Sequence, residues 1–143
     1  MIQRIQSIWL LLSSIAATLI FFIPVMNFQP GKEIQILSAD GNNLSFMMIP
    51  IWPFLLIAIF IPLISVFQFR NRLLQIRLGV YAILVHVIVF LMLGAIHLAE
   101  LPQSIMSFDL GIVLIPLAMV FLFLAIRAIR KDEKLVRSVD RIR

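Results

Sequence analysis

Four runs of residues without a charged side chain dominate the sequence, and they contain 27, 29, 22 and 17 residues. They lie between Arg4 and Lys32, Asp40 and Arg70, Arg77 and Glu100, and Asp109 and Arg127. A helix needs about 20 mainly apolar residues to cross the roughly 30 Å hydrocarbon core of a bilayer. We therefore predict four membrane-spanning helices in a single domain, over residues 6–26, 47–69, 73–98 and 108–127.

The composition supports this interpretation, because 62% of the 143 residues are hydrophobic and only 13% are charged. Soluble domains are about 45–50% apolar and about 25% charged, and a chain this short cannot bury such an excess in a core. A soluble globular enzyme and a disordered chain are therefore excluded. The absence of cysteine also excludes disulfides, thiolate metal sites and thiol nucleophiles. The predicted fold class is an all-α integral membrane four-helix bundle.

The basic residues predict how the bundle is oriented. Eleven of the 12 lie on one side of the four spans, and only Lys32 lies on the other. Because cytoplasmic segments collect Lys and Arg, both termini are expected in the cytoplasm. The first apolar run is longer than the roughly 7–15 residues of a signal-peptide core, so it is interpreted as a retained span.

The outer loop, residues 27–45, is the one sizeable segment on the outer side. Residues 33–37 roughly alternate between polar and apolar, residues 40–43 (Asp-Gly-Asn-Asn) form a turn signal, and residues 44–46 follow. This pattern predicts a small outer hairpin.

The C-terminal tail, residues 128–143, has no glycine or proline, and its apolar residues fall on one helical stripe: Leu135, Val136, Val139 and Ile142. We expect helix four to continue past the membrane as a basic amphipathic helix on the cytoplasmic side. Candidate docking residues, for lipid or for a partner protein, are Arg130, Lys131, Lys134, Leu135, Arg137, Val139 and Arg141. Anionic headgroups attract each basic residue with about 1 kcal/mol. Nucleic acid is not expected as a partner, because no aromatic residues are interleaved and no RNA-binding motif is present.

Two histidines lie in the third predicted span. His86 and His97 are 11 residues apart, close to three turns, so they share a helix face about 16 Å apart. Ionisable groups at membrane depth suggest a proton relay, haem ligation or quinone binding. The alternative is a neutral imidazole hydrogen-bonded to a neighbouring helix, and for His97 a surface pair with Glu100. They are weak candidates for cofactor binding, and no cofactor, metal site or catalytic residue is expected.

Small residues recur at helical spacing within the spans. Gly111, Ala118 and Ala125 occur at every seventh position, and Gly79 and Ala82 precede His86 on one face. Such stripes allow helices to pack closely, and a stripe that faced lipid would instead dock a partner. Interior prolines at 62 and 116 predict kinks in the second and fourth spans.

The opening residues 1–6 (Met-Ile-Gln-Arg-Ile-Gln), the span lengths and the ending from Arg127 to Ser138 resemble a known bacterial family. It comprises small four-span inner-membrane proteins described only as a domain of unknown function. The resemblance covers the whole chain and implies a location in the bacterial inner membrane. It implies no activity, cofactor or catalytic residue.

The sequence leaves three functions open, and the expected partners are the lipid bilayer and either another membrane protein or further copies of this chain. The leading function is a non-enzymatic accessory or scaffold subunit that docks through its membrane face or its tail to a larger inner-membrane assembly. The second is a small oligomeric transporter or channel-like protein with His86 lining the path. The third is a quinone- or haem-linked membrane subunit. All seven acidic residues lie at or beyond the span ends, which disfavours pumps and secondary transporters because these commonly need charge within the membrane.

Overall fold

The computed structural model describes residues 2–28, 32–34, 51–69, 71–100, 106–108 and 110–140. These residues form four α-helices: α1 (Ile2–Leu19), α3 (Ile51–Phe67), α4 (Arg72–Glu100) and α5 (Leu110–Asp140). They also form three short strands: β1 (Met26–Phe28), β2 (Lys32–Ile34) and β3 (Met106–Phe108). The predicted helical bundle is therefore confirmed as an architecture.

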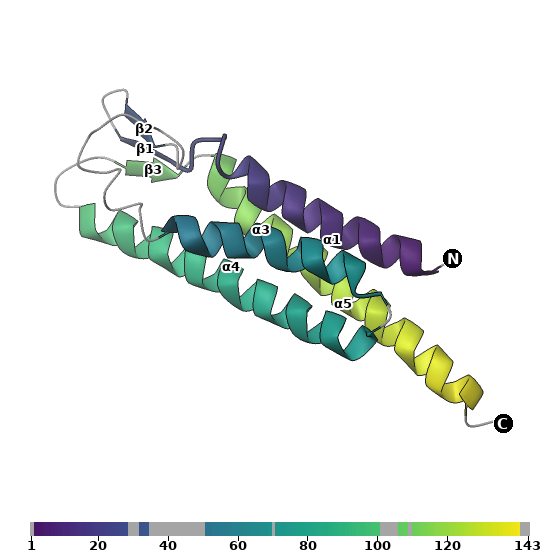
Figure 1. The fold of residues 1–143 in the computed structure, drawn as a ribbon. Helices are drawn as coiled ribbons and strands as arrows, with labels where there is room; N and C mark the ends of the chain where they lie inside the picture. Colours follow the sequence, from purple (N-terminus) through teal and green to yellow (C-terminus); the bar gives the residue numbers. More distant parts are fainter. Residues whose placement is uncertain are drawn as a thin grey trace.

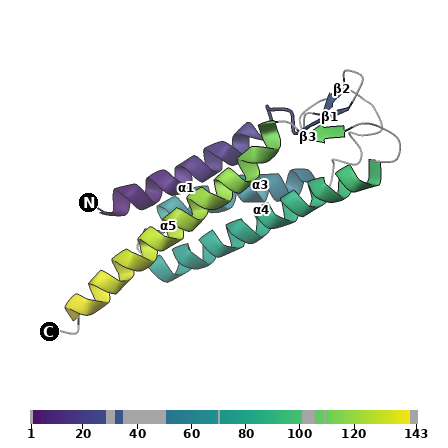
Figure 2. The same ribbon diagram turned by 180° about the vertical axis from the view of Figure 1, so that it is seen from behind.

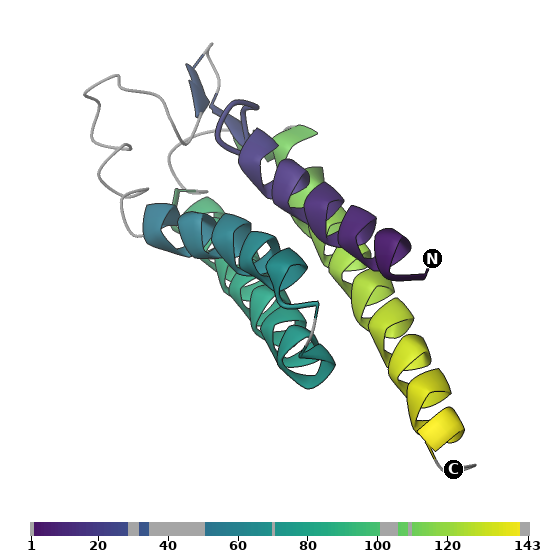
Figure 3. The same ribbon diagram turned by 45° about the vertical axis from the view of Figure 1, so that its right-hand side comes forward.

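The helices form an up-down-up-down bundle in which each helix packs on two neighbours. α1 lies between α5 and α3, and α4 lies between α3 and α5. The first residue of α1 and the last residue of α5 lie at the same end, and the strands lie at the other (Figures 1 and 2). Figure 3 shows α1 running beside α5 and α3 beside α4.

Each helix buries a narrow seam of residues spaced alternately by three and four positions. The seam residues are Gln6, Leu10, Ser13, Ala17 and Ile20 in α1, and Ile51, Leu55, Ala58, Pro62 and Ser65 in α3. They are Gln75, Gly79, Ala82, His86, Val89 and Leu93 in α4, and Gly111, Ile115, Ala118, Leu122, Ala125, Ile129 and Asp132 in α5. This mean period of 3.5 is typical of left-handed coiled-coil packing. The small residues noted in the sequence therefore face inward.

The faces outside these seams are apolar and exposed. Phe60, Leu84, Leu91 and Phe123 are between 53% and 63% exposed, and similar side chains surround all four helices. Among the described residues, Arg72–Ala95 and Leu110–Val136 are long and apolar enough to cross a membrane, and Ile5–Leu19 and Ile51–Phe67 are shorter apolar helices. Soluble monomers rarely expose continuous apolar surface of this kind.

The structure contains a short antiparallel hairpin, but it is not the one that the alternating pattern predicted. Lys32–Ile34 pairs antiparallel with Met26–Phe28, with Met26 opposite Ile34, and β1 pairs on its other edge with β3. The alternating pattern predicts strands at residues 33–37 and 44–46. Residues 35–50 lie outside the described residues, so that prediction stays untested. The β1–β3 pairing joins segments about 80 positions apart, and local periodicity carries no information on such a contact.

Two helix boundaries also differ from the predicted spans. α1 ends at Leu19 rather than near residue 26, because residues 20–23 form a turn and Pro24 disfavours helix at the residue before it. At the other end of the chain, α5 continues without interruption to Asp140, so the predicted helical tail is confirmed over residues 128–140. Pro62 and Pro116 both lie inside helices, as expected.

A backbone contact fixes where α5 begins beside the end of α1. The Gly111 amide donates a 3.0 Å hydrogen bond to the Pro24 carbonyl oxygen. A β-carbon at position 111 would overlap that same oxygen and approach the Ile23 carbonyl oxygen to 3.0 Å. Gly111 is therefore required by the close approach of two backbones.

We expect Gly111→Ala to lower the free energy of unfolding by about 1–3 kcal/mol, the usual cost of overpacking. Gly94→Ala is the matched control, because a β-carbon there meets nothing within 4 Å. That change should stabilise the helix by roughly 0.5–1 kcal/mol. Thermal unfolding in detergent, followed by helical circular dichroism, measures both. Equal stability of the two variants would contradict the assigned contact.

Candidate functional site

His86 lies in the seam of α4, and only 1% of it is exposed. Its Nδ1 lies 2.8 Å from the carbonyl oxygen of Ala82, one turn earlier in the same helix. Because a carbonyl oxygen can only accept, Nδ1 carries the proton and Nε2 is left with its lone pair. The expectation of a hydrogen bond to a neighbouring helix is therefore wrong for the described residues, since the bond closes within α4.

Along the bundle, His86 lies between two clusters of buried apolar residues. One cluster near the sheet includes Ile20, Leu55, Val89 and Ile115. The second, nearer the chain termini, consists of Leu10, Ala82, Leu122 and Ala125. The seam positions between these clusters are His86 in α4, Ser13 and Ala17 in α1, Ala58 in α3 and Ala118 in α5. We call these five residues the His86 layer.

The composition of the His86 layer explains how an imidazole fits inside so narrow a bundle. The other three helices contribute only serine and alanine, and Ser13, Ala17, Ala58 and Ala118 are all 0% exposed. Small residues opposite a large one let the backbones stay close while the ring fills the space between them. Within the described residues, His86 Nε2 and Ser13 Oγ are buried without a hydrogen-bond partner.

The other residues considered for ligand binding do not extend this site. The His97 and Glu100 side chains lie outside the described residues, so their expected pairing stays a prediction. Among the described residues, no group of three His, Cys, Asp or Glu side chains is close enough to hold a metal ion. The other four residues of the His86 layer are small and fully buried, and serine is the only one of them with a polar side chain.

Among the described residues, each pair of neighbouring helices is joined by at least one polar side chain. Gln6 Nε2 donates to Ala128 O (3.3 Å) between α1 and α5, and Ser14 Oγ donates to Ile59 O (3.2 Å) between α1 and α3. Gln75 Nε2 donates to Ser65 O (3.1 Å) between α3 and α4. The fourth contact joins α4 to α5, where Arg72 Nη1 donates to Asp132 O (3.1 Å) and Nη2 lies 3.2 Å from Asp132 Oδ2. We call these four contacts the polar ties.

The tie from Ser14 lies beside Pro62, the interior proline of α3. Proline has no amide hydrogen to donate to the carbonyl four residues earlier, which is that of Ala58, and its ring disturbs the preceding turn. The Ser14 hydroxyl donates to the next carbonyl oxygen, that of Ile59, at 3.2 Å, and lies 3.3 Å from Leu10 O of its own helix. The tie therefore meets α3 in the turn that the proline disturbs.

Three of the four polar ties lie toward the end of the bundle that contains the N- and C-termini. The sequence analysis did not predict them. Gln6, Gln75 and Asp132 are buried at seam positions, with 4%, 3% and 9% exposed. A signal was available, because each lies seven residues from a small seam residue, namely Ser13, Ala82 and Ala125. Polar residues in phase with a seam of period 3.5 predict interhelical hydrogen bonds.

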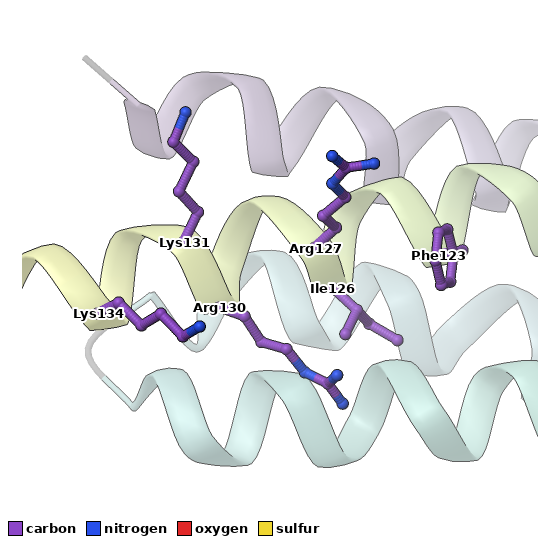
Figure 4. Close-up of a pocket in the computed structure, with 6 residues that line it drawn as sticks. All are labelled: Phe123, Ile126, Arg127, Arg130, Lys131 and Lys134. Atoms are coloured by element: carbon purple, nitrogen blue, oxygen red, sulfur yellow. The ribbon is translucent and has the colours of Figure 1, made fainter.

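Six of the seven predicted docking residues, all except Arg141, lie on the last three turns of α5. Arg130, Lys131, Lys134 and Leu135 are exposed, whereas the Arg137 and Val139 side chains and all of Arg141 lie outside the described residues. The structure brings three of them together with Arg127, Phe123 and Ile126 in a groove of about 390 Å³. We call this the basic groove. Figure 4 shows Arg127 and Lys131 extending to one side of α5 and Arg130 and Lys134 to the other.

A smaller hollow of about 360 Å³ adjoins the basic groove between α4 and α5. Leu73 and Ile76 of α4 line it together with Arg130, Glu133 and Lys134 of α5. Arg130 and Lys134 therefore line both hollows, and the smaller one also contains a carboxylate. The geometry at this end of the molecule suits the binding of an anion beside an apolar surface.

These features together define a small antiparallel four-helix bundle with an apolar outer surface and a cationic end. The chain belongs to the family described as domain of unknown function DUF4293, whose model matches residues 2–142. The resemblance drawn from the terminal motifs to an uncharacterised family is thereby confirmed. No curated protein and no solved structure matches the chain.

We expect His86→Leu to change the free energy of unfolding by less than about 1 kcal/mol. The Ala82 carbonyl keeps its backbone bond within the helix, and replacing a buried polar ring by an apolar group can be nearly neutral. Ala82→Leu is the control in the same seam, with an expected loss of about 1–3 kcal/mol from overpacking. Thermal unfolding of both variants in detergent tests this. A loss above about 3 kcal/mol for His86→Leu would mean that Nε2 holds a partner.

Proposed function

We propose that this protein is a non-enzymatic, multi-pass protein of the bacterial inner membrane that serves as an accessory or scaffold subunit of a larger membrane assembly. The observation that carries the proposal is the projection of α5 beyond the other helices (Figure 1). Leu135 and Val136 lie on this projecting segment and are 48% and 43% exposed. An apolar stripe on a helix that leaves its own bundle is suited to contact with another molecule.

The energetics of a projecting helix favour such a contact. Ordering each residue costs roughly 1–2 kcal/mol of backbone entropy, and isolated helices of this length are marginal in water. Continuation from the apolar part of α5 removes the nucleation cost but leaves the distal apolar side chains in water. Burying side chains of this size contributes up to about 1.5–3 kcal/mol each. A partner that covered Leu135 and Val136 would therefore stabilise the segment.

The membrane placement is supported by the exposed apolar faces and by the distribution of charge. Arg72, Arg77 and the cations from Arg127 to Lys134 lie toward one end of the bundle, and Lys32 is in β2 at the other. We assign the cationic end, and with it both termini, to the cytoplasm.

Cysteine labelling tests this orientation directly, because the chain has no cysteine of its own. Cysteines introduced at Gln35 and Gln103 should react with an impermeant thiol reagent from the periplasmic side. Cysteines at Asn71 and Ser138 should react only after the membrane is permeabilised. Labelling of Ser138→Cys in intact cells would overturn the orientation.

Site-specific photocrosslinking tests the docking of the projecting helix. A photoreactive residue at position 135 should form one discrete adduct with a different membrane or cytoplasmic protein. The same residue at Phe69, which is 54% exposed at the same end of the bundle, is the matched control and should not. Val136→Ser should lower the yield strongly and Lys131→Gln only slightly, since apolar burial carries the contact.

The alternatives give different outcomes in this experiment. A tail that crosslinks only to lipid, or to nothing, contradicts the scaffold proposal. A crosslink to a second copy of this chain, with a symmetric assembly in native mass measurements, favours the oligomeric transporter instead.

The second candidate function, a transport path past His86, is favoured by the unpaired Nε2 at the centre of the bundle. An unpartnered acceptor at this depth is the group that a proton or polar solute could use. The discriminating result is a His86→Leu variant with normal thermal stability and a clear loss of transport or growth.

A further inference from the structure

The outer face of α5 changes from apolar to cationic at one position. Val113, Val120 and Phe123 lie on this face and are 52–60% exposed. From Arg127 onward, the same face carries Arg127, Arg130 and Lys134, with Lys131 beside them. At 1.5 Å per residue, the segment from Phe123 to Lys134 spans about 16 Å along the helix.

This order of an apolar surface followed by a cationic one matches a phospholipid, in which the acyl chains are followed by the headgroup. The apolar residues occupy the end of the 17-residue uncharged run, and Arg127 is the first charge after it. If that run lies in hydrocarbon, the basic groove lies at the depth of the headgroups. Basic hollows on the cytoplasmic side of membrane proteins are suited to anionic headgroups.

We propose that the basic groove is a specific site for one anionic phospholipid, with the phosphate held among Arg127, Arg130, Lys131 and Lys134 and an acyl chain lying over Phe123 and Val120. This inference rests on the membrane placement in the proposed function, but not on the existence of a protein partner.

The charges that line the two hollows indicate which of them binds the phosphate. The smaller hollow includes Glu133, whose carboxylate repels an anion, whereas the described lining of the larger one contains four cations and no acid. Arg130 and Lys134 line both, so their side chains can reach the phosphate from the boundary between them. A guanidinium can also bind two phosphate oxygens at once, which a lysine cannot.

The apolar part of the groove distinguishes a lipid from other anionic ligands. A free phosphate or an acidic protein segment would gain nothing from an exposed phenylalanine one turn below the first cation. An acyl chain gains by covering it. Phe123 therefore contributes to affinity only if the ligand has a hydrocarbon chain.

The experiment is a titration of the purified full-length protein in neutral detergent, followed by native mass spectrometry. The probes are dioleoyl phosphatidylglycerol, zwitterionic dioleoyl phosphatidylcholine and glycerol 1-phosphate. We expect one phosphatidylglycerol retained per chain, with clearly weaker retention of the zwitterionic lipid. Glycerol 1-phosphate should not compete at equal concentration.

Two pairs of variants locate the site. Arg130→Gln should weaken phosphatidylglycerol binding about fivefold, the effect expected for one cation at an anionic headgroup. Arg77→Gln removes the same charge from an exposed position of α4 at the same end and should have little effect. Phe123→Ala should weaken binding roughly fivefold by removing apolar contact, and Phe90→Ala, 44% exposed on α4, should not.

Each contrary result has a definite meaning. Equal retention of both lipids, or equal effects of Arg130→Gln and Arg77→Gln, would reduce the groove to general surface charge and overturn the proposal. Effective competition by glycerol 1-phosphate would assign the groove to a soluble phosphate and overturn it as well. None of these results would affect cysteine labelling or the position-135 crosslink, so failure here is distinguishable from failure of the proposed function.

Discussion

The narrowness of the buried seams is the constraint on which the rest of the structure depends. With alternating spacings of three and four, each helix turns only a thin strip toward its neighbours, and the remaining faces stay apolar and exposed. In water this surface would drive aggregation, whereas in hydrocarbon it has no cost. A narrow seam also limits what the interior can contain. Large and small residues must alternate, as Ile115, Ala118, Leu122 and Ala125 do in α5.

In a bilayer, apolar packing alone would not fix how such helices are aligned along their axes, because lipid tails are as apolar as leucine. The polar ties supply that alignment, one for each of the four helix interfaces. Each donates to a backbone carbonyl, so the contact depends on the position of a helix turn as well as on the acceptor residue. Interhelical hydrogen bonds of this kind average about 0.6 kcal/mol. Their contribution is therefore to register more than to stability. Breaking the Arg72–Asp132 tie on one side only would also leave a largely buried charge unpaired.

The sequence predicted the parts of the fold that depend on local pattern. Uncharged runs located the four helices, the spacing of Gly111, Ala118 and Ala125 predicted an inward-facing stripe, and the absence of helix breakers predicted that α5 continues into the tail. The parts it missed depend on distant contacts. The pairing of β1 with β3 and the approach of Gly111 to Pro24 both join segments that lie far apart in the sequence. The hydrogen bond of His86 was expected on another helix, but the small residues of its layer offer no acceptor side chain except serine. Of the basic groove, the sequence predicted Arg130, Lys131 and Lys134 as docking residues. It missed Arg127, Phe123 and Ile126, because these precede the tail (residues 128–143) in which docking residues were sought.

The same constraint separates the two candidate sites. The His86 layer consists of one ring and four small, fully buried residues, so any solute that reached Nε2 would have to separate closely packed helices. The basic groove requires no such movement, because it lies on the exposed face of α5. Residues on that face do not pack in the buried seam. Because the interior is filled by packing side chains and most of the described cations lie toward one end, the accessible charged groups of this chain are concentrated at that end. This favours a role in binding over a role in moving solutes through the bundle.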